Sequence, residues 1–307
     1  MHAFLAIPES GMARNYPIKY MQIRTKKIRK RYDINRKMYV FSGGMIRCDM
    51  NNLVCLATLG DANHHEASSI WAESPISCFL IQNENGLVMF DTGAHPDAMT
   101  ERWDPENRRK TPVEFDERSF IVDNLKAIGY TPDDVDYVVL SHLHEDHAGC
   151  LEFFGKSKII VSDTELAQTM KLYAVNKGMA AYIRNDIRHW LDADLDWNTI
   201  ADDEGEVDLM DGIKILNFGS GHTFCMLGLL VTLPNSGAFI LASDTLNTAK
   251  NYGYPICYPG CAYDTRGYMK TAERIHKLAD RYHAQVIFGH DGEQYRQIKK
   301  GPDQWYD

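Results

Sequence analysis

From residue 38 onward, hydrophobic and polar residues alternate in short runs that predict a first group of strands. Met38–Phe41 is rich in residues that favour strands. Ile76–Gln82 and Leu87–Asp91 predict a hairpin, because an Asn-Glu-Asn-Gly turn separates them. Tyr137–Ser141 and Lys158–Val161 are short apolar runs that predict two further strands.

The second half of the chain repeats this arrangement. Ile213–Phe218 predicts a strand, Met226–Leu233 and Ala238–Leu241 predict a second hairpin, and Val286–Phe288 predicts the last clear strand.

Helices are predicted between these groups of strands. Phe120–Ile128 has helical spacing and ends at Gly129, and another helix is predicted from about Thr164. A third helix carries one apolar face, formed by Tyr268, Ala272, Ile275, Ala279 and Tyr282. This order predicts an α/β fold with two sheets lying between helices, although periodicity alone fits other α/β layouts equally well.

Two segments depart from the pattern. Lysine and arginine crowd residues 19–37, so we expect residues 1–37 to be a basic N-terminal extension. Such an arm either binds an anionic partner or is a solvated or dimer-packing segment. Residues 165–211 are first aromatic and then acidic, which fits an inserted cap over an active site and equally an acidic loop on a helical pair. The main domain is expected over residues 38–307.

Composition narrows the partners and the compartment. A net charge of −9 argues against nucleic acid as a partner, because a phosphate-binding surface normally shows a basic excess. No run of apolar residues is long enough for a membrane span, and residues 1–11 lack the basic start of a secretory peptide. The seven cysteines are scattered, which favours a reduced, cytoplasmic protein. Cys257 and Cys261 lack the second pair that a structural zinc site needs.

The strongest chemical signal follows the strand that ends near residue 141. His142 and His144 are two residues apart, so in an extended segment their imidazoles point the same way and can reach one metal. Asp146 and His147 lie beyond a turn and can serve a second metal nearby. Imidazole and carboxylate ligands suit zinc, and also manganese, iron or cobalt.

Further candidate ligands lie just past other apolar strands. His222, Asp244 and His290 occupy such positions, where layered α/β proteins commonly build their active sites. Asp244 is a candidate for bridging two metals with one carboxylate. Asp91 also ends a strand, and we expect it to orient a ligand imidazole or a metal-bound water, unless it only caps a turn before Gly93.

These motifs resemble the metallo-β-lactamase superfamily, and within it most of all the N-acyl-homoserine lactone lactonases, which are quorum-quenching enzymes. The superfamily resemblance rests on the H-x-H-x-D-H run at 142–147, on Asp-Thr-Gly at 91–93, and on the later histidines and aspartate in the same order. The lactonase resemblance adds residues 129–134 and 288–294. Together it covers roughly residues 38–295.

The resemblance implies an αβ/βα four-layer sandwich that holds two divalent metal ions, with zinc expected first and iron, manganese or cobalt as alternatives. By the same resemblance, one metal is bound by His142, His144 and His222, the other by Asp146, His147 and His290, and Asp244 bridges them. The implied reaction is the opening of a lactone ring by a hydroxide held between the metals, with Asp146 passing the proton to the leaving oxygen. Another lactone, an ester or a thioester (as in glyoxalase II) is the alternative substrate, and a phosphodiester is disfavoured by the acidic charge.

The chain departs from the lactonase pattern at two positions. Asn247 stands where the family usually has a tyrosine that helps to hold the lactone carbonyl, so we expect Asn247 to take part in catalysis and Tyr252, Tyr254 or Tyr258 to contact the substrate. Glu145 stands where the family often has an aromatic residue, and we expect it to make the mouth of the site more polar and to contact the substrate.

Overall fold

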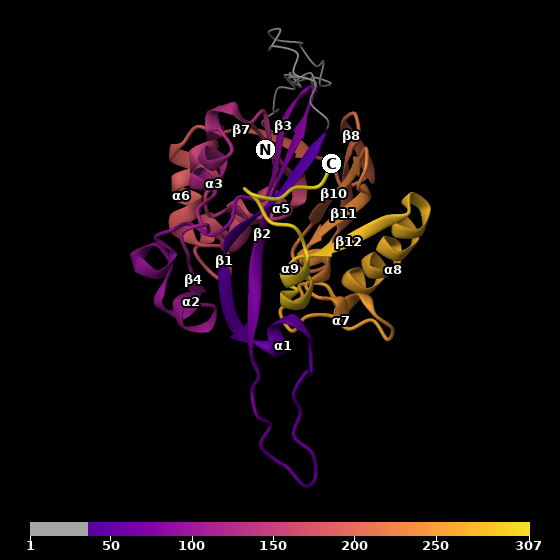
Figure 1. The fold of residues 1–307 in the computed structure, drawn as a ribbon. Helices are drawn as coiled ribbons and strands as arrows, with labels where there is room; N and C mark the ends of the chain where they lie inside the picture. The colour runs from indigo at the N-terminus through magenta and orange to yellow at the C-terminus, as the bar shows by residue number, and fades with distance from the viewer. Residues whose placement is uncertain (1–35) are drawn as a thin grey trace, which may run out of the picture. The chain divides into compact units, whose positions relative to one another are not determined.

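The computed structural model describes residues 36–307, whose strands form two sheets (Figure 1). The first sheet has the spatial order β4 (Val113–Glu114), β1 (Lys37–Asp49), β2 (Trp71–Asn83), β3 (Gly86–Phe90), β5 (Tyr137–Val139), β6 (Lys158–Ser162) and β7 (Asp196–Ile200). The second has the order β12 (Ala284–Phe288), β11 (Gly237–Ser243), β10 (Met226–Leu233), β9 (Ile213–Gly219) and β8 (Glu206–Met210). Strands β3, β5, β6 and β7 are parallel neighbours, as are β11 and β12, and the other pairs are antiparallel.

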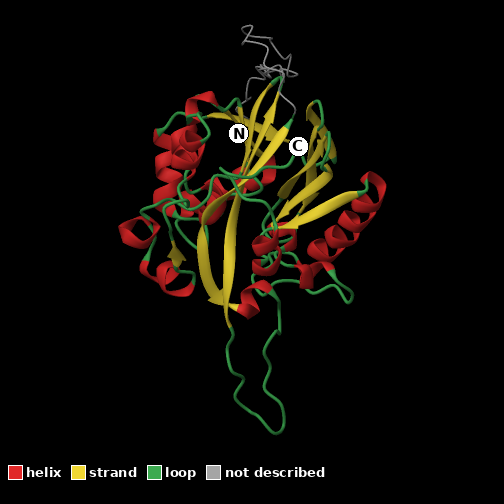
Figure 2. Ribbon diagram, viewed as in Figure 1, coloured by secondary structure: helices red, strands yellow, loops and turns green. Residues whose placement is uncertain are grey.

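Helices cover the outer faces of the two sheets (Figure 2). Those that pack against the first sheet include α3 (Ile121–Ala127), α5 (Asp163–Val175) and α6 (Arg184–Asp192), and α8 (Thr265–Tyr282) packs against the second. The remaining α-helices are short: α1 (Met50–Leu53), α2 (Pro105–Lys110), α4 (Glu145–Ala148), α7 (Ala249–Tyr252) and α9 (Gly292–Gln297).

Alternation along the strands explains the layers. In β1, Met38 and Val40 face the core between the two sheets, whereas Tyr39 faces the core beneath the helices. In β10, Leu229 faces the second sheet's inner side and Leu230 packs with the residues of α8. Each sheet is therefore buried on both faces, and the fold is the αβ/βα four-layer sandwich that the sequence resemblance implied.

Most predicted elements are confirmed, and their boundaries shift by a few residues. Both hairpins form, with Asn83 opposite Gly86 at the turn between β2 and β3. Strand β1 extends well beyond the predicted Met38–Phe41. The prediction stopped too early because a register shift between Ser42 and Gly44 interrupts the alternation that marks a strand in sequence.

The acidic stretch at 165–211 is built into both sheets. It contains most of α5, all of α6, the edge strand β7 of the first sheet and the edge strand β8 of the second. Residues 196–210 therefore do not form an inserted cap, because β7 pairs with β6 and β8 pairs with β9. The parts of this stretch that approach the site described below are the start of α5 and the connection between α5 and α6.

Two other expectations concern the ends of the chain and the membrane. The proposed basic extension at residues 1–37 lies outside the described residues except for Arg36 and Lys37. Arg36 is paired with Asp211, their nearest charged atoms lying 2.6 Å apart. Among residues 36–307, none of the helices has both the length and the apolar character needed to cross a membrane.

Candidate metal centre

The predicted ligands lie just beyond the carboxyl ends of strands from both sheets. His142 and His144 follow β5, which is parallel to its neighbours β3 and β6. Asp244 directly follows β11, and His290 lies two residues beyond β12, the parallel neighbour of β11. His222 lies three residues beyond β9. Residues far apart in the chain therefore meet at one edge of the sandwich, where open sheets commonly place their sites.

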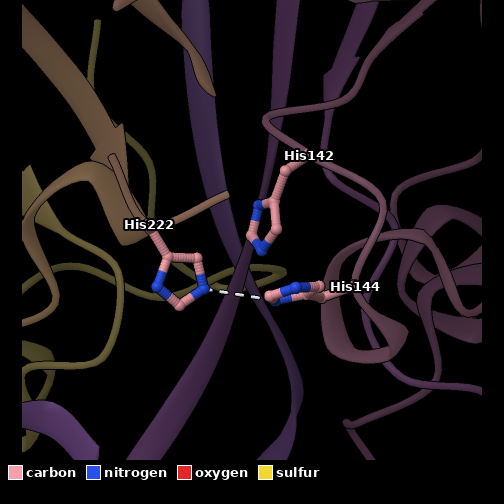
Figure 3. Close-up of side chains that lie close together, drawn as sticks. All are labelled: His142, His144 and His222. Carbon is pink, nitrogen blue, oxygen red and sulfur yellow. Dashed lines mark hydrogen bonds between the residues drawn. The ribbon is translucent and has the colours of Figure 1, made fainter. Parts of the chain in front are cut away.

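Three histidines form the first group of converging side chains. His142, His144 and His222 each offer a ring nitrogen, and these atoms all lie within 4.8 Å of one another (Figure 3). Nε2 of His222 is 3.2 Å from Nδ1 of His144. The ring of His142 stands nearly perpendicular to both other rings. This is a donor set that suits a divalent cation such as zinc.

A second group lies beside the first, and one carboxylate faces both. Asp146, His147 and His290 offer ligand atoms within 4.8 Å of one another. Oδ1 of Asp244 lies 3.0 Å from Nε2 of His290 and 3.3 Å from Nε2 of His147, while its Oδ2 lies 3.2 Å from Nε2 of His222 and 3.1 Å from Nε2 of His290. The carboxylate of Asp244 thus contacts members of both groups, which is the position expected of a bridging ligand. All seven predicted ligands are brought together.

Hydrogen bonds behind the imidazoles fix which nitrogen faces the site. Nδ1 of His147 is 2.9 Å from Oδ2 of Asp91, so the histidine donates to the carboxylate and presents Nε2. Nδ1 of His142 is 2.9 Å from the hydroxyl of Ser141, which itself donates to Asp91. Nδ1 of His290 faces the carbonyl oxygen of Pro75 at 3.0 Å. The position of Asp91 agrees with the orienting role expected from the sequence.

The backbone around Asp244 is strained and closely packed. Asp91 and Ser243 have positive φ values of 58° and 47°, which non-glycine residues rarely adopt. The Ser243 hydroxyl donates to Asp91 at 3.2 Å, which ties the two strained positions together. A Cβ at Gly289 would lie 2.5 Å from Oδ1 of Asp244, so glycine is required beside His290. The sequence motifs Asp-Thr-Gly and Gly-His thus mark real geometric constraints.

Burial and mutual charge set the protonation of the ligands. Burial, reinforced by neighbouring imidazoles, holds the pKa values of His142 and His144 well below the usual range, so both are neutral donors. Burial alone would raise the pKa of Asp244, but the imidazoles of His290, His147 and His222 hold it well below its usual value. Burial opposes the charged form of His290, yet Asp244 and Asp146 outweigh it and raise its pKa to about 10.

Two of the candidate donor atoms lack a hydrogen-bond partner, although other members of the cluster contact one another. Nε2 of His142 and Nε2 of His147 are enclosed, yet neither has a hydrogen-bond partner within residues 36–307. A buried polar atom without a partner costs free energy unless a ligand occupies the site. These two orphaned nitrogens, pointing into a cluster of imidazoles and carboxylates, fit two divalent cations.

Asn247 is buried at the metal centre, where it contacts Asp244, one of the candidate metal ligands. Its Nδ2 donates to Oδ2 of Asp244 at 3.0 Å, and its Oδ1 lies 3.4 Å from the hydroxyl of Tyr268. The contact that the structure gives is therefore with the bridging candidate, and a direct contact of Asn247 with a substrate carbonyl stays a prediction.

The residues expected to contact the substrate have other partners in this structure. Tyr252 and Tyr254 both stack on the ring of His276 in α8, with ring centroids 3.8 Å and 5.1 Å from it. Glu145 is buried, and its Oε1 accepts a long hydrogen bond of 3.5 Å from Asn107. Substrate contact by these residues stays a prediction.

Residues that the sequence did not single out also reach the site. The ring of Tyr182 stands edge-on to His144, with centroids 4.7 Å apart, and its hydroxyl donates to the buried carboxylate of Glu165. Both lie in the stretch 165–211, whose aromatic residues were the available signal. Sγ of Cys261 is 3.8 Å from Nδ1 of His222, behind the donor atom.

Comparisons with known proteins show the family of this chain. A sequence profile of the metallo-beta-lactamase superfamily matches residues 71–290. N-acyl homoserine lactonase AiiB of Agrobacterium fabrum is 37% identical over 276 residues, which is 89% of this chain and all of that protein.

Solved structures share the fold. A crystal structure of an N-acyl homoserine lactone hydrolase, with the product N-hexanoyl-L-homoserine at its catalytic metal centre, superposes with a TM-score of 0.72 at 24% identity, over 88% of this chain and 98% of that one. The dizinc quorum-quenching lactonase AidC superposes with a TM-score of 0.59 at 15% identity, over 84% and 88% of the two chains. The protein therefore belongs to the metallo-β-lactamase superfamily, among relatives that are named N-acyl homoserine lactonases.

Proposed function

We propose that this protein is a hydrolase that opens the ring of N-acyl-homoserine lactones with the help of two divalent cations. The observation that carries the proposal is the convergence of seven histidine and aspartate side chains, with the carboxylate of Asp244 in contact with both groups. The substrate class follows from the relative that is 37% identical along its whole length.

The same residues would hold the two cations. His142, His144 and His222 would hold one, Asp146, His147 and His290 would hold the other, and the carboxylate of Asp244 would lie between them. When bound, such a pair of cations supplies a water of lowered pKa and polarises the lactone carbonyl. Zinc suits these ligands best, and iron, manganese or cobalt use the same donors.

The chain's own residues prepare and complete the reaction. Asp91 and the carbonyl of Pro75 keep His147 and His290 in the tautomer that presents Nε2. Asn247 holds the carboxylate of Asp244 in place. Asp146, whose Oδ2 lies 3.3 Å from Nε2 of His290, is the buried acid placed to hold a proton and deliver it to the ring oxygen as the ester bond breaks.

A row of aromatic residues beside His144 offers a surface for the acyl chain. Tyr182 is buried against His144, Phe224 stacks on Tyr182 with centroids 5.7 Å apart, and Tyr263 meets Phe224 at 4.8 Å. Tyr263 is 62% exposed, so the row runs from the buried site to the surface. Aromatic faces of this kind bind alkyl chains by burying their apolar surface.

The composition of the chain supports proposals about its cellular compartment and its partners. Seven free cysteines fit a reducing compartment, so we place the enzyme in the cytoplasm. A net charge of −9 fits a small-molecule substrate rather than a nucleic acid. Assembly as a homodimer stays a prediction.

Product analysis tests the substrate class. The zinc-loaded protein is incubated with N-hexanoyl-homoserine lactone, with a simple γ-lactone and with a thioester, and the products are identified by mass spectrometry. We expect the acyl-homoserine lactone to gain one water and the metal-free protein to leave it intact. Hydrolysis of the thioester alone would reject the lactone and support the alternative substrate.

A further inference from the structure

Glu165 is a fully buried carboxylate beside the metal centre, and it belongs to none of the motifs that predicted the metal ligands. It lies in the first turn of α5 with no exposed surface. Its Oε1 accepts from the hydroxyl of Tyr182 at 2.9 Å and from the backbone N–H of Leu143 at 3.2 Å. Its Oε2 accepts from the backbone N–H of Cys225 at 3.2 Å.

The three donors come from the segments that surround the three-histidine group. Leu143 lies between His142 and His144, and Cys225 lies three residues after His222. One carboxylate therefore joins the loop after β5 to the loop between β9 and β10, across the two sheets. A direct backbone hydrogen bond from Leu227 to Ser141 runs beside it at 2.8 Å.

The third donor extends this restraint to an imidazole ring. The Tyr182 hydroxyl is held by Glu165 while its ring stands edge-on against His144, with an interplanar angle of 75°. Fixing the hydroxyl therefore also limits how the ring of His144 can turn. No comparable restraint reaches the other group from Glu165, because His147 is held by Asp91 and His290 by the carbonyl of Pro75.

Burying a carboxylate costs free energy unless hydrogen bonds compensate for the lost hydration. Hydrogen bonds to an ionised acceptor are shorter and stronger than those between neutral groups, so they position their donors firmly.

We infer that Glu165 is a positioning residue that sets His142, His144 and His222 in register for one of the two cations and has no contact with the ligands of the other. This inference rests on the metal centre proposed above and adds an asymmetry to it. Asp91 contacts His147 and, through Ser141, His142, whereas Glu165 supports only the three-histidine group, so a change at Glu165 should separate the two affinities.

Metal titration tests the inference. Metal-free full-length protein is titrated with Zn²⁺ against a competing chelator, for the wild type and for Glu165→Ala, Glu165→Gln and Tyr182→Phe. Loss of an outer partner typically weakens metal binding roughly 10- to 100-fold. We expect Glu165→Ala to weaken one Zn²⁺ by that factor and to leave the other unchanged. Glu165→Gln should recover part of the loss, since its amide oxygen still accepts from Tyr182 or Leu143.

The control is Asp163→Asn, an exposed acid in the same first turn of α5, which should bind both Zn²⁺ ions as the wild type does. If Glu165→Ala does not fold, Glu165→Gln and Tyr182→Phe decide, and each should weaken the same single Zn²⁺. Unchanged affinity for both ions, or equal weakening of both, would overturn the inference. Two Zn²⁺ bound without lactone hydrolysis would instead reject the proposed substrate, while the titration would still test the role of Glu165. Fewer than two Zn²⁺ bound by the wild type would reject both.

Discussion

Asn247 takes part in a short chain of side chains that ends on the bridging candidate. Its amide donates to Asp244 and faces the hydroxyl of Tyr268 at 3.4 Å. If Asn247 acts by positioning Asp244, removing the Tyr268 hydroxyl should loosen Asn247 and so lower the catalytic rate slightly. We expect Tyr268→Phe to lower kcat about fivefold, equivalent to about 1 kcal/mol for one weak hydrogen bond, with KM unchanged.

The companion variant separates the two roles of Asn247. Asn247→Ala should lower kcat more than Tyr268→Phe, and steady-state kinetics on one lactone measures both. A large loss in Asn247→Ala beside a fully active Tyr268→Phe would favour direct contact between Asn247 and the substrate carbonyl over the positioning role.

Glu165 makes stability depend on pH in a defined direction. Burial raises its pKa from 4.5 to about 7, so the folded protein holds this proton more tightly than the unfolded chain does. The stability tied to the protonated form is complete below about pH 4.5 and is lost as the pH rises through about 7, an effect of about 3 kcal/mol.

Urea unfolding of the metal-free protein measures this effect. Glu165→Gln carries no titrating group at this position, so its stability relative to the wild type should increase by up to about 3 kcal/mol from pH 5 to pH 8. Asp163→Asn should show no such change. A difference between Glu165→Gln and wild type that does not vary with pH would contradict the prediction.

At the residue scale, the sequence could predict the ligands and Asp91, but not the residues that support the three-histidine group. His142 and His144 were predictable because alternation in an extended segment fixes their common direction. Asp91 was predictable because it ends a strand. Glu165 and Tyr182 carry no such pattern, since their role depends on hydrogen bonds to Leu143 and Cys225 that only the packed fold creates.

At the element scale, the aromatic row beside His144 links the α5–α6 connection to the loop after β9. Phe224 is its middle member, between Tyr182 and Tyr263. We expect Phe224→Ala to reduce kcat/KM for long-chain acyl-homoserine lactones about tenfold, because about 1.4 kcal/mol corresponds to losing the burial of roughly two methylene groups.

Chain length is the internal control for this variant. The same kinetics with a butanoyl substrate and with a simple γ-lactone should change little, since neither reaches far along the row. An equal fall in kcat/KM for every substrate would show that Phe224 supports the site itself and does not select the acyl chain.

The edge strands explain where element prediction from the sequence failed. β7 is Asp-Trp-Asn-Thr-Ile and β8 is Glu-Val-Asp-Leu-Met, and several of their side chains are exposed. An edge strand needs little apolar surface, so its composition resembles an acidic loop. The buried strands β3, β10 and β11 were predictable because both of their faces are covered, which requires continuous apolar runs.

At the scale of the whole domain, the metals should join the two halves of the sandwich. The ligands come from loops of both sheets, so cations bound to the folded state add stability by mass action. At one hundred times the dissociation constant, one site contributes about 2.7 kcal/mol. For a domain of this size we expect chelation to lower Tm by roughly 5–10 °C.

Calorimetry with and without chelator measures this shift, and added Zn²⁺ should restore the original Tm. The Asp244→Ala variant should show a much smaller shift, because it lacks the carboxylate that faces both groups. An unchanged Tm in the wild type after complete metal removal would contradict the view that the cations connect the two sheets.

The most direct test of a two-metal lactone hydrolase is to add Zn²⁺ stepwise to the metal-free protein while recording proton release from N-hexanoyl-homoserine lactone in a pH-stat. We predict that activity rises with added metal, saturates at two Zn²⁺ per chain and is absent from Asp244→Ala. Full activity without metal, or two bound Zn²⁺ with no proton release from the lactone, would contradict it.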